Sequence, residues 1–485
     1  MRVRSRRDVV ALSMLRLDAA SAVPLRRQLL LRLRDAIVAR ELAAGARVPS
    51  TRAVASALGV SRNTVADVFA QLIAEGYLVA HAGSGTFVAE EMPSPGPAPV
   101  RTAWERASLR GRLLAGDDVR RRVTAVRPIA FQPGVPALEA FPFETWARLA
   151  GKVVRRSARE QLGYGDAAGY GPLRDAIAAE LRAQKDIACS RDQVIIVSGT
   201  QQAIDLIGRL MLDPGDDVWI EDPASWGTRT SLRGAGANLV AVPVDDEGLD
   251  VDEGCRRSPN ARLAYVTSGH QWPLGPALSV ARRHALLAWA SRADAWVVED
   301  EYDSVIDLEG VVTPRLATLD RERRVIWVGT FSISLFPAIR LAYLVAPPGL
   351  VDAFTAAKTV ADRATATLEQ AILAEFMYDG AYVRHLARMR EVYAERRAHL
   401  VEMLESHVGI SPRTAVSGLH VVLPLGADVD DVALANAAER AAVSAPALSP
   451  YYLGRPQRGL VLGFGAAPRA AITRAARTLG VVVAG

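Results

Sequence analysis

The sequence has little cysteine and little lysine. Two cysteines are too few for a disulfide framework and indicate a reducing compartment, so the cytoplasm is the expected location. The longest uncharged run, residues 263–281, contains prolines and polar side chains, which excludes it as a membrane span. Basic residues are almost all arginine, so any chemistry that needs a lysine amine depends on Lys152, Lys185 and Lys358.

Length and charge indicate several domains with different partners. The chain has 485 residues, half of them hydrophobic, which predicts two or three well-packed domains. Residues 1–89 carry 13 arginines against 6 acidic residues, whereas the remainder carries 45 basic and 47 acidic residues. The positive field therefore belongs to the N-terminal part, as expected for a domain that meets a polyanion.

The N-terminal part has the pattern of a helix-turn-helix. A helix is predicted over 24–40, because apolar residues recur there at Leu25, Leu29, Leu33 and Ile37. Two shorter helices are predicted over 51–58 and 62–75, each after a serine N-cap and separated by the turn residue Gly59. Strand-like segments predict a small hairpin after them, at residues 77–79 and 86–88.

Five short motifs in this part occur in order, at Pro24-Leu25, Gly45–Arg52, Leu58–Val65, Glu75–Tyr77 and Gly83–Phe87. Together they resemble the winged helix-turn-helix domain of the GntR superfamily. The resemblance implies double-stranded DNA as partner, with the second helix in the major groove. The residues it implies as DNA-binding are Arg52, Ser61, Arg62, Asn63, Thr64 and the wing tip Gly83, Ser84 and Gly85. The alternative is a plain helical hairpin whose arginines form a solvated surface.

A linker and a large α/β domain are predicted to follow. Residues 90–130 are rich in proline and arginine and are expected to form the linker between domains 1–89 and 131–485. Apolar strand-like runs then alternate with helical stretches, which predicts a mostly parallel sheet covered by helices on both faces. From about residue 353 a long helical region and two strands, 420–423 and 460–463, predict a smaller α+β subdomain.

Polar residues gather at four expected strand ends, where ligands bind in such sheets. Residues 198–202 open a helix whose N–H groups suit a phosphate. Residues 298–303 place carboxylates at the end of a buried strand, so a cationic partner is expected there. A polar turn at 270–275 and an anion-binding wall complete the set, the wall being formed by Thr330, Ser332 and Arg340.

Motifs along residues 131–485 occur in order, among them Phe131–Pro136, Leu162–Asp166, Asp213–Asp216, Glu221–Pro223, Gly329–Pro348 and Tyr451–Gly454. They resemble the fold-type I aminotransferase-like domain of MocR/GabR-type regulators. The resemblance implies a homodimer and a pyridoxal 5'-phosphate (PLP) site. In that site Asp300 would pair with the pyridine nitrogen and Tyr302 with the ring hydroxyl. The other cofactor-binding residues expected are Thr200, Gln201, Gln271, Thr330, Ser332 and Arg340.

Three positions depart from the family pattern. The Schiff-base lysine is replaced by Ile333, the stacking aromatic by Ser225 with Trp226 beside it, and a glycine by Ala342. Isoleucine has no amine and cannot form an imine, so covalent attachment of PLP and enzymatic turnover are not expected. The three lysines are not expected to substitute, since Lys152 and Lys185 are expected to lie far from the motif segments and Lys358 in a separate helical stretch.

The sequence therefore predicts a DNA-binding transcriptional regulator with a catalytically inactive aminotransferase-like domain. That domain is expected to sense a small anionic effector without a covalent bond, and PLP, a PLP–amino acid adduct and another metabolite all stay open. No metal site and no membrane partner are expected. Two alternatives remain: a PLP-dependent enzyme with an appended DNA-binding domain, and a DNA-binding protein whose large domain only dimerises.

Overall fold

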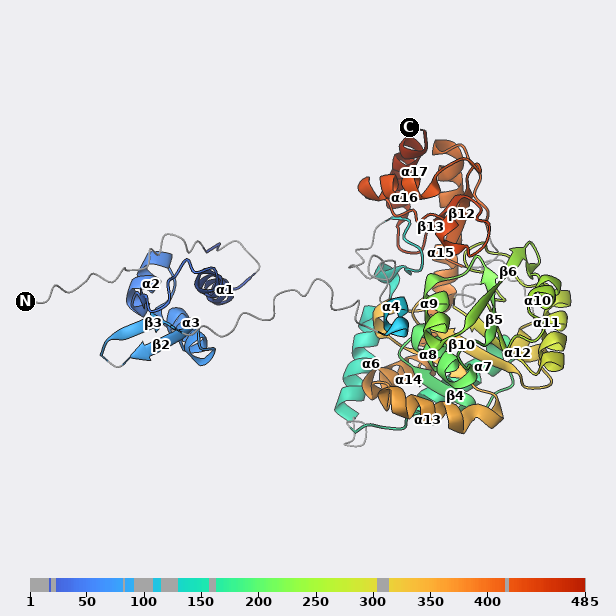
Figure 1. Ribbon diagram of the computed structural model, residues 1–485, viewed down its shortest axis with the longest axis horizontal. Coiled ribbons are helices and arrows are strands. Elements are labelled where there is room, and N and C mark those ends of the chain that lie inside the picture. The colour runs from blue at the N-terminus through green and yellow to red at the C-terminus, as the bar shows by residue number, and fades with distance from the viewer. Residues whose placement is uncertain are drawn as a thin grey trace, which may run out of the picture. The chain divides into compact units, whose positions relative to one another are not determined.

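The computed structural model in Figure 1 describes residues 17–18, 23–81, 83–90, 108–114, 130–156, 163–302, 314–414 and 418–484. The chain divides into two compact units, residues 1–106 and 107–485. Within the described ranges, no helix has the length and hydrophobicity that a bilayer span requires.

The smaller unit is a winged helix-turn-helix, as predicted. Its helices are α1 (Leu25–Val38), α2 (Thr51–Leu58) and α3 (Arg62–Ala74). Its sheet has the antiparallel order β1-β3-β2, formed by β1 (Arg47–Val48), β2 (Leu78–His81) and β3 (Gly85–Val88). The two-residue strand β1 was not predicted, because so short a segment carries no alternation of apolar and polar residues.

Local chemistry sets the helix boundaries of this unit. The Ser50 hydroxyl accepts a hydrogen bond from the Ala53 N–H (3.3 Å) and caps α2, and the Ser61 hydroxyl accepts one from the Thr64 N–H (3.1 Å) and caps α3. Between them Gly59 has φ 65°, which lets the chain turn between the helices. The apolar faces meet in one core that includes Leu29, Leu33, Val54, Val65, Val68 and Leu72.

The predicted linker is partly wrong. Residues 109–114 form helix α4 (Leu109–Leu114), which packs against helix α9 (Trp226–Ala235) of the larger unit. A Cβ built on Gly234 would lie 2.7 Å from Leu114 Cδ2, so the absence of a side chain there makes room for Leu114. Composition misled the prediction, because a short helix stabilised by tertiary packing needs no strong local pattern. Residues 91–107 and 115–129 lie outside the described residues.

The larger unit is built on an eight-stranded sheet with the order β4-β11-β10-β9-β8-β5-β6-β7. Its first half contains β4 (Val194–Val197), β5 (Asp217–Asp222), β6 (Asn238–Asp245) and β7 (Gly248–Leu249). The second half contains β8 (Leu263–Val266), β9 (Trp296–Glu301), β10 (Val325–Thr330) and β11 (Ala342–Val345). Strands β7 and β11 run against the others, so the mostly parallel sheet is confirmed.

Helices cover both faces of this sheet, as Figure 1 shows. They are α6 (Phe143–Arg156), α7 (Gly171–Lys185), α8 (Thr200–Met211), α9, α10 (Val251–Arg257), α11 (Val280–Ala293), α12 (Leu316–Leu319), α13 (Val351–Asp362) and α14 (Thr367–Tyr378). One face packs Ile220, Val298 and Val328 together with apolar residues of α8. The other buries Trp219 against Trp289, whose ring centroids are 3.8 Å apart. The burial of both faces explains why the strands read as continuous apolar runs.

The C-terminal part forms a smaller α+β subdomain, coloured orange to red in Figure 1. It contains α15 (Ala381–His407), β12 (His420–Pro424), α16 (Asp431–Arg440), β13 (Gly459–Gly463) and α17 (Arg469–Ala484). Strands β12 and β13 pair antiparallel and confirm the two strands predicted here. The subdomain has its own apolar core, which also includes Phe131 and Ala137 from the start of the larger unit.

Candidate functional site

The larger unit contains a cavity of about 210 Å³ at the carboxyl ends of its parallel strands. Strands β5, β8 and β9 lead into it, and the first turns of α8 and α9 contribute further walls. This is the end of the sheet at which the sequence predicts a ligand. The lining residues are Thr200, Gln201, Ile204, Glu221, Ala224, Ser225, Thr228, Tyr265, Thr267, Trp272, Asp300 and Tyr302.

An anion cradle adjoins the cavity at the N-terminus of α8. Gly199 has φ 136°, and a Cβ built there would lie 2.7 Å from Arg340 Nη2, so the guanidinium rests against glycine backbone. Arg340 is exposed, and no carboxylate among the described residues pairs with it. The Ser198 N–H donates to Gln202 Oε1 (2.7 Å), which fixes the turn that enters α8. A helix N-terminus beside an unpaired guanidinium is suited to a phosphate or carboxylate.

Asp300, Tyr265 and Tyr302 form a further part of the cavity wall. Asp300 is buried, and its Oδ2 accepts a hydrogen bond from the Tyr265 hydroxyl. Burial raises the pKa of Tyr265 far above its ordinary value, and the nearby Asp300 carboxylate adds to this rise, so Tyr265 stays protonated and remains a donor. Tyr302 lines the same cavity, and its hydroxyl lies 2.9 Å from His270 Nδ1. Asp300 and Tyr302 are thus brought together, as the sequence predicts.

A second carboxylate, that of Glu221, lines the cavity from β5. Its Oε2 accepts hydrogen bonds from the Thr267 N–H (3.2 Å), the Thr267 hydroxyl (2.6 Å) and Gln271 Nε2 (3.4 Å). Burial raises the pKa of Glu221 to about 7 despite these donors. Gln271 also donates to the carbonyls of Pro223 (2.7 Å) and Trp272 (2.6 Å), so its amide holds the loop in place and does not line the cavity.

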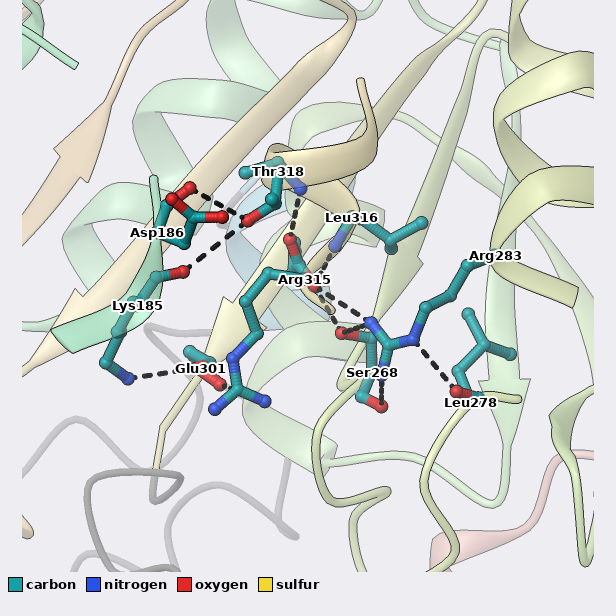
Figure 2. Close-up of polar contacts among 11 residues, drawn as sticks. Lys185, Asp186, Ser268, Leu278, Arg283, Glu301, Arg315, Leu316 and Thr318 are labelled. Carbon is teal, nitrogen blue, oxygen red and sulfur yellow. Dashed lines mark hydrogen bonds and ion pairs between the residues drawn. The ribbon is translucent and has the colours of Figure 1, made fainter. Parts of the chain in front are cut away.

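The other two carboxylates near the end of β9 have cationic partners, which confirms the expectation for them. Glu299 pairs with Arg283 (3.4 Å), and both side chains are completely buried. Glu301 pairs with Lys185 (3.2 Å) and Arg315 (3.1 Å). Figure 2 shows Arg283 reaching Ser268 and Leu278 on one side of this network and Lys185 with Arg315 around Glu301 on the other.

Hydrogen bonds connect the C-terminal subdomain to the end of β5, which borders the cavity. The carboxylate of Asp222 accepts hydrogen bonds from the N–H groups of Leu453 (2.6 Å) and Gly454 (2.9 Å). Arg229 on α9 donates to three carbonyls of the same segment, those of Pro450 (2.8 Å), Tyr451 (3.2 Å) and Tyr452 (3.3 Å). Residues 450–454 are therefore held directly against the end of β5.

The predicted cofactor-binding residues are not all brought together. Thr200, Gln201, Asp300 and Tyr302 line the cavity, and Arg340 adjoins it at Gly199. Gln201 also links two helices, because its Nε2 donates to the Gly227 carbonyl (3.1 Å) and to the Ser231 hydroxyl. The hydroxyl of Thr330 accepts from the Ser332 N–H (3.2 Å), and Thr330 lines a separate cavity of about 10 Å³.

Ile333 is half-buried and packs against the apolar core of the C-terminal subdomain. None of the three lysines lines the cavity. Lys152 pairs with Glu375 (2.5 Å), and Lys358 is buried beside Asp362 (2.6 Å). The expectation that Lys185 lies far from the motif segments is wrong, because it pairs with Glu301, the neighbour of Asp300. Folding brings α7 next to the end of β9, although the two are more than a hundred residues apart in the chain.

The predicted DNA-binding residues lie at the surface of the smaller unit. Arg62 and Asn63 are exposed at the first turn of α3, and Ser61 and Thr64 form its cap. The wing-tip residues and Arg52 are exposed as well. An exposed N-terminal turn of a second helix beside a hairpin has the geometry of a major-groove reader with a wing.

Sequence reasoning missed several residues at both places. Arg47 on β1 lies beside the wing, because its Nε would be 3.0 Å from a Cβ built on Gly85. Arg47 lies within the Gly45–Arg52 motif, and this position could have identified it as a candidate DNA-binding residue. In the cavity, Tyr265 was missed because it lies in an apolar strand, and Thr228 because it lies within helix α9 and not at a strand end. Glu221 was part of a quoted motif, but nothing in that motif shows which way its side chain faces.

Family models match both units. The model for bacterial regulatory proteins of the gntR family matches residues 25–88, and that for aminotransferase class I and II matches residues 134–461. The chain is 40% identical to the probable rhizopine catabolism regulatory protein MocR of Rhizobium meliloti, covering 93% of this chain and 92% of that protein. The chain belongs to the MocR-type regulators. This chain consists of a GntR helix-turn-helix domain, which implies DNA binding, and an aminotransferase-like domain.

Other relatives fit this family assignment. The HTH-type transcriptional regulator TauR of Rhodobacter capsulatus is 33% identical over 84% of this chain and 85% of its own length. Among solved structures, LysN, the α-aminoadipate aminotransferase of Thermus thermophilus, superposes with a TM-score of 0.72 at 28% identity. It covers 79% of this chain and 98% of LysN, which is complexed with N-(5'-phosphopyridoxyl)-L-leucine. This MocR-type chain thus resembles named regulators along most of its length and enzymes in its larger unit.

Proposed function

We propose that this MocR-type regulator binds DNA through residues 24–89 and senses a small anionic effector, non-covalently, in the cavity of its larger unit. The observation that carries the proposal is the cradle at Gly199, where the exposed Arg340, which has no acidic partner among the described residues, rests against the N-terminus of α8. An unpaired guanidinium at a helix N-terminus favours an anion. Ile333 has no amine with which to bond that anion covalently.

The residues present fit PLP as a reversibly held ligand. Thr200 and Arg340 would hold its phosphate, Asp300 its ring nitrogen and Tyr302 its ring hydroxyl. Only glycine at position 199 leaves room for the guanidinium beside the helix, which supports the phosphate end of this assignment. When bound, PLP supplies an aldehyde and an electron-withdrawing ring. A PLP–amino acid adduct and another phosphorylated metabolite satisfy the same cradle.

No observation favours turnover by this chain. Transfer chemistry with PLP requires a lysine at the ring, and the three lysines form ion pairs away from the cavity. We therefore propose that the aminotransferase-like domain of this chain binds ligand without catalysing its conversion, and that a bound ligand changes the affinity for DNA.

A titration tests the sensing proposal. PLP, alone and with candidate amino acids, is added to the full chain while the tryptophan fluorescence, to which Trp272 in the cavity wall contributes, is followed. DNA affinity is measured in parallel on a sequence selected from a random pool. We expect saturable binding that dialysis reverses, no added mass after borohydride treatment, and altered DNA affinity. Intact DNA binding with no response to any of these ligands would count against PLP sensing.

Arg62→Ala should weaken DNA binding about tenfold, because one charge-assisted phosphate or base contact contributes about 1–2 kcal/mol. The matched control is Arg32→Ala, which removes the same charge from an exposed position on α1. Fluorescence anisotropy on the selected DNA, repeated at several salt concentrations, measures both. Ligand affinity should stay unchanged in both variants. Equal DNA affinity in the Arg62 variant and the wild type would refute the proposed docking of α3.

A further inference from the structure

Glu221 differs from Glu299 and Glu301, the two glutamates near the end of β9. It is only 4% exposed, yet it has no cationic partner among the described residues, whereas Glu299 and Glu301 each pair with arginine or lysine. Burying a carboxylate without a cation lowers the stability of the folded state, so such a group is uncommon unless it binds a ligand. The cost here is reflected in the pKa of Glu221, which burial raises to about 7.

The two oxygens of Glu221 have different surroundings. Oε2 is satisfied by three donors, two from Thr267 and one from Gln271. Oε1 receives no hydrogen bond from the described residues, and Glu221 lines the cavity together with Thr228 and Asp300. The protein thus holds the carboxylate in one orientation through Oε2 and leaves Oε1 for whatever occupies the cavity.

The anion cradle belongs to the same cavity as Glu221, because Thr200 also lines it. A ligand that satisfies both ends must carry an anionic group and, separately, a protonated nitrogen that donates to a carboxylate. Charge-assisted hydrogen bonds of this kind are about twice as strong as neutral ones, and they are stronger still in a buried site.

We propose that Glu221 is a specificity-determining residue that binds a protonated amine of the effector, whose phosphate or carboxylate is held at Thr200 and Arg340. The effector class is therefore a small molecule with one anionic and one cationic group. This inference rests on the proposed function for the anionic end only. The assignment of Glu221 to the cationic end stands on the burial, the missing partner and the cavity.

Matched probes test the inference without knowledge of the natural effector. Aminoalkyl phosphates with two to five carbons are compared by calorimetry with alkyl phosphates of equal length, using the full chain. We expect at least one aminoalkyl phosphate to bind about tenfold more tightly than its match, since the added ion pair contributes about 1.4 kcal/mol. Glu221→Gln should abolish this preference and leave the alkyl phosphate affinity unchanged, because Gln keeps an oxygen acceptor for Thr267.

The outcomes separate the two proposals. If no phosphate binds, the proposed function fails at its cradle. If phosphates bind but the amine gives no preference in the wild type, or the preference persists in Glu221→Gln, the role of Glu221 is wrong. Glu253→Gln is the charge control, because Glu253 pairs with Arg256 and Arg257 on α10 and does not line the cavity. The wild-type comparison stands even if the Gln variant folds poorly.

Discussion

Arg283→Met is expected to lower the free energy of unfolding of the larger unit by about 3–5 kcal/mol. Arg283 is completely buried. Its guanidinium contacts both Glu299 and the loop that leads to the cavity. It donates to the Leu278 carbonyl (2.9 Å), the Ser268 carbonyl (2.7 Å) and the Ser268 hydroxyl (3.0 Å). Methionine fills much of the space but leaves the buried Glu299 carboxylate without its cation.

The neighbouring Arg282→Met is the control, because Arg282 pairs with the exposed Asp245 and should cost less than about 1 kcal/mol. Urea unfolding followed by tryptophan fluorescence measures both variants. Burial raises the pKa of Glu299, and Arg283 opposes this rise. Without the arginine the folded-state pKa is higher still, so the variant should lose more stability than wild type as the pH rises above the ordinary glutamate pKa. A loss as small as that of Arg282→Met would show that Glu299 is already neutral.

Arg340→Ala is expected to weaken the binding of PLP and of simple alkyl phosphates about 100-fold. Two charge-assisted hydrogen bonds to a phosphate contribute about 1.5–3 kcal/mol each, partly offset by water in this exposed position. The free arginine forms no ion pair with described residues, so its removal should not disturb the fold. Thermal unfolding of the variant should therefore match that of wild type.

The control for Arg340→Ala is Arg209→Ala on α8, the helix whose N-terminus lies beside Arg340. Arg209 lies in the last turn and pairs with Asp205 (2.9 Å), so it tests the loss of a positive charge away from the cradle. Calorimetry with PLP and with ethyl phosphate gives the affinities, and DNA binding without ligand should be equal in all three proteins. If Arg209→Ala weakens phosphate binding as much as Arg340→Ala does, a general field and not the cradle holds the anion.

The folds of both units follow largely from local patterns. The run Val194–Val197 is apolar throughout, and its burial on both faces of the sheet explains why. The serine N-caps before α2 and α3 predict the first residue of each helix correctly. Helix α4 was missed because its stability comes from contact with α9, more than a hundred residues away in the chain. Patterns within a short window do not contain such contacts.

The candidate site was predictable only in part. Thr200, Asp300 and Tyr302 follow from the ends of strands and the start of a helix, which sequence can locate. The direction in which a side chain points at a strand end depends on the twist of the strand and on neighbouring residues. The sequence therefore did not predict that Glu221 lines the cavity or that Thr330 lines a separate one. Likewise the proximity of Lys185 to Glu301 is a tertiary contact with no local signal.

The engagement of every lysine in an ion pair has a practical consequence for chemical labelling. Aldehydes and active esters react with accessible, uncharged amines, and on most proteins surface lysines give a large unspecific background. Here Lys358 is fully buried, Lys185 is nearly so, and Lys152 is held by Glu375. Any aldehyde-derived absorbance that grows slowly in this protein is therefore attributable to Lys152 or the terminal amine, and the Lys152→Arg variant separates these two sources.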